Sequence, residues 1–240
     1  MSTNCKNCGT EITQKYCPNC GQAATLKRID GHYIVHEIEH VLHFEKGILY
    51  TVRELVLRPG KNVRQFLSEN RSRLVKPIIF IIITSLIYTI ITHLFHVEEG
   101  YVNVSETKVN STVLIFKWVQ DHYGYGNIIM GVFIALWLKL FFRKHQYNFF
   151  EILILLCFVM GIGMLIFAVF ALIQGLTHWN LVSIGGLVGF AYCAWAIAQF
   201  FDPSKVMSYV KSLFAYILGM LSFLLVGMGI GLLIDLVIKK

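Results

Sequence analysis

Charged residues are scarce in this 240-residue chain. Asp, Glu, Lys and Arg make up 15% of it, whereas they make up about 25% of an ordinary soluble domain. Hydrophobic residues make up 56% and aromatic residues 14%. This composition excludes a disordered chain, a coiled coil, a nucleic-acid-binding arm and a wholly soluble globule. Residues 1–24 also lack an apolar core, so we expect no secretory signal there.

The charges that are present lie mainly before Pro77. Residues 1–76 hold 12 Lys and Arg against seven Asp and Glu, a net charge of +5, whereas residues 77–240 hold nine against seven. The second stretch carries the long apolar runs, and about 20 apolar residues in a helix cross a bilayer. We therefore predict an all-α membrane protein with about five transmembrane helices, a count of four being the alternative. The predicted spans are about 77–95, 127–142, 150–173, 180–201 and 212–237.

The basic residues predict an orientation. Residues 46–76 contain eight Lys and Arg against Glu54 and Glu69, and the loops at 143–145 and 203–205 are also basic. The positive-inside rule places such segments, and with them the N-terminus, in the cytosol. The net charge of +7 therefore needs no nucleic-acid partner, and we expect anionic lipid headgroups to lie against this basic segment.

Four of the six cysteines form two Cys-x-x-Cys-Gly knuckles separated by eight residues: Cys5, Cys8, Cys17 and Cys20. Two such turns bring four thiolates together in a tetrahedron, which is the closed geometry of a structural zinc site. We therefore predict a zinc ribbon over residues 1–24, with a small β-hairpin in residues 9–16 and structural Zn²⁺ as the cofactor. The alternatives are two disulfides or an iron site of the rubredoxin type. A cytosolic location favours metal over disulfides.

A histidine stripe follows the ribbon. On a helix, four histidines fall within an arc of about 80° on the polar face: His32, His36, His40 and His43. The stripe contains the pattern His-Glu-x-x-His, in which a zinc hydrolase would use His36 and His40 as ligands and Glu37 as the base. No third ligand is identifiable and the motif lies in a polar segment. A solvated surface and a metal or partner site are the other interpretations of the stripe.

Residues 46–76 read as two basic amphipathic helices that lie in the membrane interface. The apolar face of the first helix comprises Ile48, Leu49, Val52, Leu55 and Val56. The apolar face of the second comprises Val63, Phe66, Leu67 and Leu74. Arg58-Pro59-Gly60 separates them, because proline and glycine break a helix at this point. The predicted domains are thus a zinc ribbon (1–24), cytosolic basic helices (25–76) and a transmembrane bundle (77–240).

The ribbon, followed by residues 47–55 (GILYTVREL), residues 58–61 (RPGK) and Arg71-x-Arg73-x-x-Lys76-Pro77, resembles an uncharacterised family of bacterial integral membrane proteins with an N-terminal zinc ribbon. The resemblance covers roughly residues 1–95. It implies a bacterial cytoplasmic (inner) membrane location and a metal, and no activity.

Glycines inside the spans predict close helix contacts, because small residues let helix backbones approach each other in a bilayer. They occur as Gly161 and Gly163, as Gly185-Gly186-x-x-Gly189, and as Gly227-x-Gly229-x-Gly231. Ionisable residues stay near the predicted span ends, at Lys139, Glu151 and Asp235, which argues against ion-coupled transport.

We therefore expect a non-enzymatic membrane component, a scaffold, assembly factor or regulator, that docks a protein partner through its ribbon. A homo-oligomer is a further expected arrangement. The alternatives are a small-molecule or ion transporter or pore, and a zinc-dependent membrane hydrolase at His36, Glu37 and His40. A transporter requires a polar path through the glycine-lined helices, whereas the hydrolase requires a third metal ligand.

Overall fold

The computed structural model describes residues 3–5, 8–12, 14–20, 47–69, 71, 73–95, 97, 111–177 and 179–238. The chain divides into two compact units, residues Met1–Leu42 and His43–Lys240. The predicted histidine stripe lies outside the described residues.

The N-terminal unit contains a small antiparallel ladder. Strand β1 (Thr3–Asn4) pairs with β2 (Glu11–Ile12), with Thr3 opposite Ile12. A hairpin was expected within residues 9–16; the ladder instead begins before the first knuckle, so that the hairpin loop itself carries Cys5 and Cys8. Gly9 has a positive φ of 75°, the left-handed backbone that glycine adopts without strain in the turn after the knuckle.

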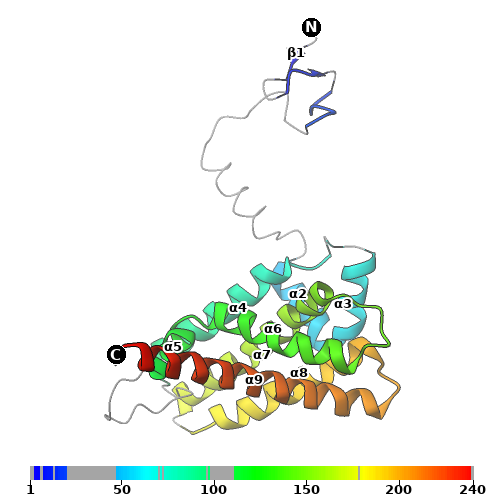
Figure 1. Cartoon of the computed structure of the whole chain (residues 1–240). Coiled ribbons are helices and arrows are strands. Elements are labelled where there is room, and N and C mark those ends of the chain that lie inside the picture. The colour runs from blue at the N-terminus through cyan, green and yellow to red at the C-terminus, as the bar shows by residue number, and fades with distance from the viewer. Residues whose placement is uncertain are drawn as a thin grey trace. The chain divides into compact units, whose positions relative to one another are not determined.

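The second unit is all-helical (Figure 1). Its described helices are α2 (Gly47–Leu57), α3 (Pro59–Ser68), α4 (Pro77–Leu94), α5 (Ser111–Asp121), α6 (Tyr123–Phe141), α7 (Phe149–Thr177), α8 (Val182–Phe201) and α9 (Val206–Ile238). Five of them, α4 and α6 to α9, are long and apolar enough to cross a membrane. The predicted architecture, an all-α membrane protein with five spans and a cysteine cluster near its N-terminus, is confirmed.

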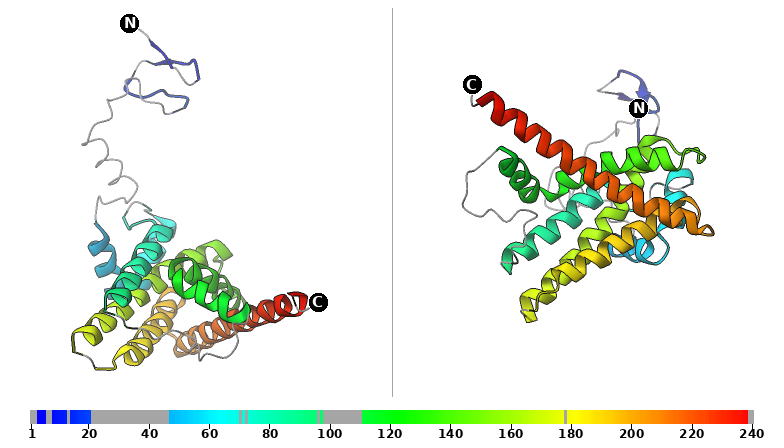
Figure 2. Two further views of the ribbon diagram at one scale, coloured as in Figure 1. Left: turned by 90° about the vertical axis from the view of Figure 1, so that its left-hand side faces the viewer. Right: turned by 60° about the horizontal axis from the view of Figure 1, so that its bottom comes forward.

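Helix α7 is the centre of this unit and contacts α2, α3, α4, α6 and α8. About two thirds of its most apolar window (67%) is buried, whereas only 11% of the corresponding window of α9 is buried. Helix α9 is 33 residues long, about 50 Å at 1.5 Å per residue. Figure 2 shows its C-terminal end extending past the neighbouring spans with α5 beside it.

The helix boundaries follow local capping signals. Pro59 and Pro77 begin α3 and α4, where a missing backbone N–H is harmless. At the start of α7, the Glu151 backbone N–H donates to Asn148 Oδ1 (2.9 Å) and the Asn148 N–H donates to Glu151 Oε2 (2.7 Å). This reciprocal pair is a capping box, so Glu151 has a structural role at the helix end.

The second span differs from the sequence expectation. It was expected at 127–142, but α6 begins at Tyr123, directly after the amphipathic α5. The additional turn lengthens the span. Lys139, which lies near the end of this span as expected, donates to the Tyr147 backbone carbonyl.

The glycine contacts are confirmed at most positions. A Cβ on Gly161 would lie 2.7 Å from the Phe80 ring of α4, and one on Gly185 would lie 2.6 Å from Phe170 of α7. Gly227 and Gly231 accommodate α5 rather than another span. The expectation for Gly229 was wrong, because no described heavy atom lies within 4 Å of the position its Cβ would take.

Aromatic contacts hold the α6–α7 loop against the end of α8 at one end of the helical unit. The Phe142 and Phe201 rings stack with centroids 3.9 Å apart, and the Tyr147 and Phe200 rings lie 4.5 Å apart. These contacts join the α6–α7 loop to the end of α8, and α3 packs beside them. Exposed cations gather at this end, which we call the basic end: Arg53, Arg58, Lys61, Arg71, Lys76, Arg143, Lys144 and Lys205.

Candidate metal centre and juxtamembrane helix pair

The two cysteine knuckles converge on one point. The Sγ atoms of all four cysteines lie within 4.8 Å of one another. Cys5 Sγ lies 3.5 Å from Cys20 Sγ, and Cys8 Sγ lies 3.5 Å from Cys17 Sγ. Each of these two contacts joins one cysteine of the first knuckle to one cysteine of the second, as expected of four thiolates that share one ion.

These distances fit a tetrahedral metal site. Four sulfurs at about 2.3 Å from one ion would lie about 3.8 Å apart, whereas a disulfide requires about 2.05 Å between its sulfurs. Cys5 and Cys17 are 4% and 3% exposed, and Cys8 and Cys20 are exposed, so two ligands lie inside the ribbon and two at its surface. The four cysteines could thus bind one metal ion, and they would leave no coordination position open.

The surroundings of Cys8 favour the thiolate form. Its Sγ lies 3.3 Å from Thr10 Oγ1. Hydrogen bonds with the Thr10 side chain and backbone lower the pKa of the Cys8 thiol from 9.0 to about 6. Since the thiolate is the metal-binding form of cysteine, this ligand is available at neutral pH.

A second cluster lies in the helical unit, where one arginine joins three segments. Arg73 Nη2 donates to Glu54 Oε2 (3.0 Å) and its Nε donates to the Tyr50 hydroxyl (3.0 Å), both on α2. Its Nη1 donates to Gln65 Oε1 of α3 (2.7 Å). The hydrogen bond with Tyr50 is the main cause that raises the pKa of Arg73; partial burial opposes it, and the charges of Tyr50 and Glu54 add to it. We call these four side chains the Arg73 clasp; it holds α2, α3 and the segment that leads into α4.

Helix α3 is also fixed to the end of α8. Arg64 Nη1 donates to the backbone carbonyls of Gln199 (2.7 Å) and Phe200 (2.6 Å). Both are among the last four carbonyls of α8, which have no partner within the helix. The Gly60 backbone approaches so closely that a Cβ there would lie 2.1 Å from the Gln199 carbonyl oxygen.

The carbonyls at the end of α2 are satisfied in the same way. Asn62 Nδ2 donates to the Glu54 carbonyl (2.9 Å), and the Tyr192 hydroxyl donates to the Leu55 carbonyl (3.0 Å). Val75 N–H donates to Thr51 Oγ1 (3.1 Å), which ties the segment before α4 to α2. The pair α2–α3 is therefore packed into the same unit as the spans, with Leu55, Val63 and Phe66 in the common core.

Both predicted amphipathic helices are present as α2 and α3. They were expected to form a separate region lying in the membrane interface, whereas in the structure they pack in the same unit as the spans. The apolar face of α3 covers α8. Only α2 retains exposed apolar side chains, with Leu49 81% and Leu57 60% exposed.

From the sequence, Arg64 is only one member of the basic segment, and Arg73 belongs to that segment and to the motif shared with the uncharacterised family. One feature of the sequence could have indicated this contact. Gly60 and Arg64 are four residues apart and therefore share a helix face, on which the glycine allows a close approach and the arginine can donate hydrogen bonds to the same neighbour. The acceptors on α8 carry no comparable signal. By contrast, His36, Glu37 and His40 lie outside the described residues, so the hydrolase site stays a prediction.

Comparison with known protein families yields a match. Residues 45–89 match the family model described as "Protein of unknown function (DUF3667)". This agrees with the resemblance to an uncharacterised family, and the matched segment comprises α2, α3 and most of α4, including the whole Arg73 clasp. No curated protein and no solved structure matches the chain.

Proposed function

We propose that this protein is a non-enzymatic membrane component, a scaffold, assembly factor or regulator, that docks a protein partner through a zinc-bound ribbon. The convergence of four cysteine sulfurs within 4.8 Å is the observation that supports it best. An ion held by four protein ligands has no position for water or substrate, so its role is structural. A ribbon of this size lacks an apolar core and requires the ion to fold.

The ion we propose is Zn²⁺. Zinc has no redox chemistry and needs no apolar shell to protect it, which suits a site in which the ligands Cys8 and Cys20 are exposed to solvent. A reducing cytosol would keep the thiols available for metal. The ribbon and the basic end would then both lie on the cytosolic side of a bacterial inner membrane.

The grouping of exposed cations at the basic end supports this orientation, because positively charged loops are retained in the cytosol. The same side chains would attract anionic lipid headgroups, at about 1 kcal/mol per Lys or Arg near the surface. Fluorescent-protein and alkaline-phosphatase fusions test the topology. An N-terminal fusion should fluoresce, and a fusion after residue 240 should have phosphatase activity because five spans place that end outside. The reverse pattern would contradict the orientation.

The docking role is tested by affinity capture from detergent-solubilised membranes. We compare the wild type with Cys17→Ser, which removes one buried ligand, and with Lys15→Ser, an exposed ribbon position that is not a ligand. A docked partner should be captured by the wild type and Lys15→Ser, and lost with Cys17→Ser or after chelation. Capture of the same proteins by all three forms would rule out docking through the ribbon.

A further inference from the structure

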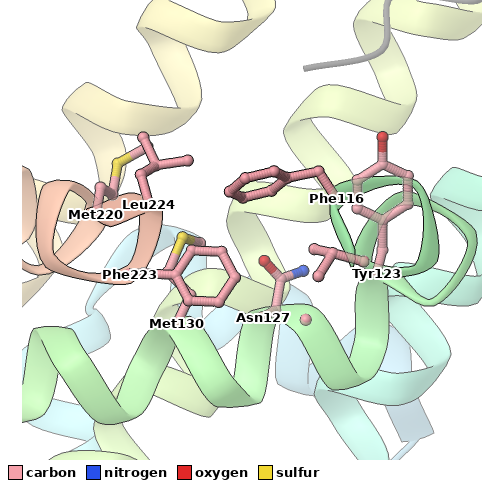
Figure 3. Close-up of a pocket in the computed structure, with 9 residues that line it drawn as sticks. Phe116, Tyr123, Asn127, Met130, Met220, Phe223 and Leu224 are labelled. Carbon is pink, nitrogen blue, oxygen red and sulfur yellow. The ribbon is translucent and has the colours of Figure 1, made fainter. Parts of the chain in front are cut away.

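A cavity of about 70 Å³ lies between α5, α6 and α9 (Figure 3). Its lining is mainly apolar, and the amide of Asn127 is already paired, because its Nδ2 donates to Ser85 Oγ of α4 (3.4 Å). The cavity therefore offers little that would select a ligand. The cysteines of the ribbon differ in this respect, because two of them lie at the surface, where solutes reach their sulfur atoms.

Each knuckle of the ribbon contributes one buried and one exposed cysteine. Cys5 and Cys17 are buried, whereas Cys8 and Cys20 are exposed. A metal site holds its cysteines as thiolates, and the thiolate is also the form of cysteine that oxidants attack. With an ion bound, the exposed sulfurs of Cys8 and Cys20 are therefore the ligands that a small dissolved oxidant reaches first.

Each exposed sulfur also lies next to a buried sulfur of the other knuckle. Cys8 Sγ is 3.5 Å from Cys17 Sγ, and Cys20 Sγ is 3.5 Å from Cys5 Sγ. The sulfurs of a disulfide are about 2.05 Å apart, so each pair has to close by only about 1.5 Å. A sulfur that is oxidised at the surface therefore has a buried thiolate within reach.

We propose that the ribbon is a peroxide-sensitive switch, in which the exposed Cys8 and Cys20 are the thiols that react with peroxide. The buried Cys17 and Cys5 are their respective disulfide partners. This inference rests on the proposed function, because it requires a ribbon that holds a metal ion and docks a partner.

The reaction is a two-electron oxidation in two steps. The exposed thiolate attacks one oxygen of hydrogen peroxide, the O–O bond breaks, and the sulfur becomes a sulfenic acid while hydroxide leaves. The buried thiolate then attacks this sulfur, the S–O bond breaks, and a second hydroxide leaves. Two protons convert both hydroxides to water, so that one peroxide is reduced while two thiolates become one disulfide.

The disulfide takes away two of the four ligands of the ion. Within the described part of the ribbon, the buried cluster consists of Cys5 and Cys17, so packing alone does not hold this unit together. Disulfides in a reducing cytosol are transient, because thiol reductants reopen them. Docking through the ribbon would thus be lost during oxidation and regained after reduction.

The first test follows the metal. The full chain, purified with zinc in detergent, is treated with hydrogen peroxide while a pyridylazoresorcinol dye reports free Zn²⁺. One zinc ion per chain should be released, and a phosphine reductant with added zinc should restore it. A chain that holds zinc and keeps it in peroxide would overturn the switch alone. A chain that holds no zinc would overturn the proposed metal site as well.

The second test identifies the disulfides by alkylation, trypsin digestion and mass spectrometry. Cleavage at lysines yields peptides 1–6 and 7–15, with one cysteine each, and peptide 16–27, with two. The switch predicts that both shorter peptides are joined to 16–27. Disulfides within the knuckles would instead join 1–6 to 7–15, which would contradict the proposed pairs. Cys157 and Cys193, buried in α7 and α8, should stay reduced in the same samples.

A double variant locates the site of attack. Cys8→His with Cys20→His keeps four ligands, because zinc also binds two cysteines with two histidines. The variant lacks exposed sulfurs, so peroxide should release its zinc at least about tenfold more slowly than from the wild type. Lys15→Ser, an exposed position that is not a ligand, should behave as the wild type. Equally fast release from the double variant would refute the role of the exposed thiols. Should the double variant bind no zinc, the disulfide pairs of the wild type decide.

Discussion

The ribbon and the helical unit hold their structures by different means. Within the described part of the ribbon the only buried core cluster consists of Cys5 and Cys17, whereas the main apolar core of the helical unit extends over α2 to α4 and α6 to α9. The ribbon therefore depends on an ion, and the helical unit depends on packing and on hydrogen bonds at its helix ends. Perturbing one unit should leave the stability of the other unchanged.

The largest effect is expected from removing the metal. Structural zinc contributes about 10–16 kcal/mol in small zinc domains, more than such a ribbon can replace by packing. Chelation or Cys17→Ser should unfold the ribbon and increase tryptic cleavage at Lys15 at least tenfold. The thermal unfolding of the helices, followed by circular dichroism, should not change. A melting transition that shifts together with metal loss would show that the two units are coupled.

Gly60→Ala should have the largest effect among the helical-unit variants. Its Cβ would overlap the Gln199 carbonyl, so α3 or α8 must move, and we expect the unfolding free energy to fall by about 3 kcal/mol. Gly229→Ala is the matched control, because its Cβ enters open space and alanine favours a helix. Equal destabilisation by the two variants would show that the α3–α8 approach is unimportant.

Arg64→Met should cost somewhat less, about 2 kcal/mol, because it removes two charged hydrogen bonds to the end of α8 while keeping an apolar stem. Lys61→Met, an exposed position on the same helix, should change the unfolding free energy by less than about 0.5 kcal/mol. Chemical denaturation in detergent measures both. If the two variants are indistinguishable, Arg64 does not fix α3.

The smallest effect is expected at the Arg73 clasp. Arg73 and Glu54 are 29% and 22% exposed, so water screens their attraction. A double-mutant cycle with Arg73→Met and Glu54→Gln should give a coupling energy of about 0.5–1 kcal/mol. A coupling near zero would mean that Tyr50 and Gln65 hold Arg73 in place without the ion pair.

The sequence predicted what depends on local pattern. The five spans follow from the length of the apolar runs, the break between α2 and α3 follows from Pro59 and Gly60, and the cysteine cluster follows from the spacing within and between its knuckles. In each case the residues that determine the feature are neighbours in the chain, so that the pattern is visible without the fold.

The contacts that sequence reasoning missed join distant segments. Arg64 binds carbonyls 135 and 136 positions away, and a backbone carbonyl carries no sequence signal. Asn127 reads as one amide at the start of a span, and the cavity around it exists only because α5 and α9 pack beside α6. Such features are determined by helix arrangement, which the apolar pattern leaves open.

Native mass spectrometry of the intact chain, released from detergent, tests the central claim most directly. The account predicts one zinc ion per chain in the wild type and in Lys15→Ser, and none in Cys17→Ser or after chelation. A wild-type chain that carries no metal and is lighter by four hydrogens, as two disulfides would make it, would contradict the account.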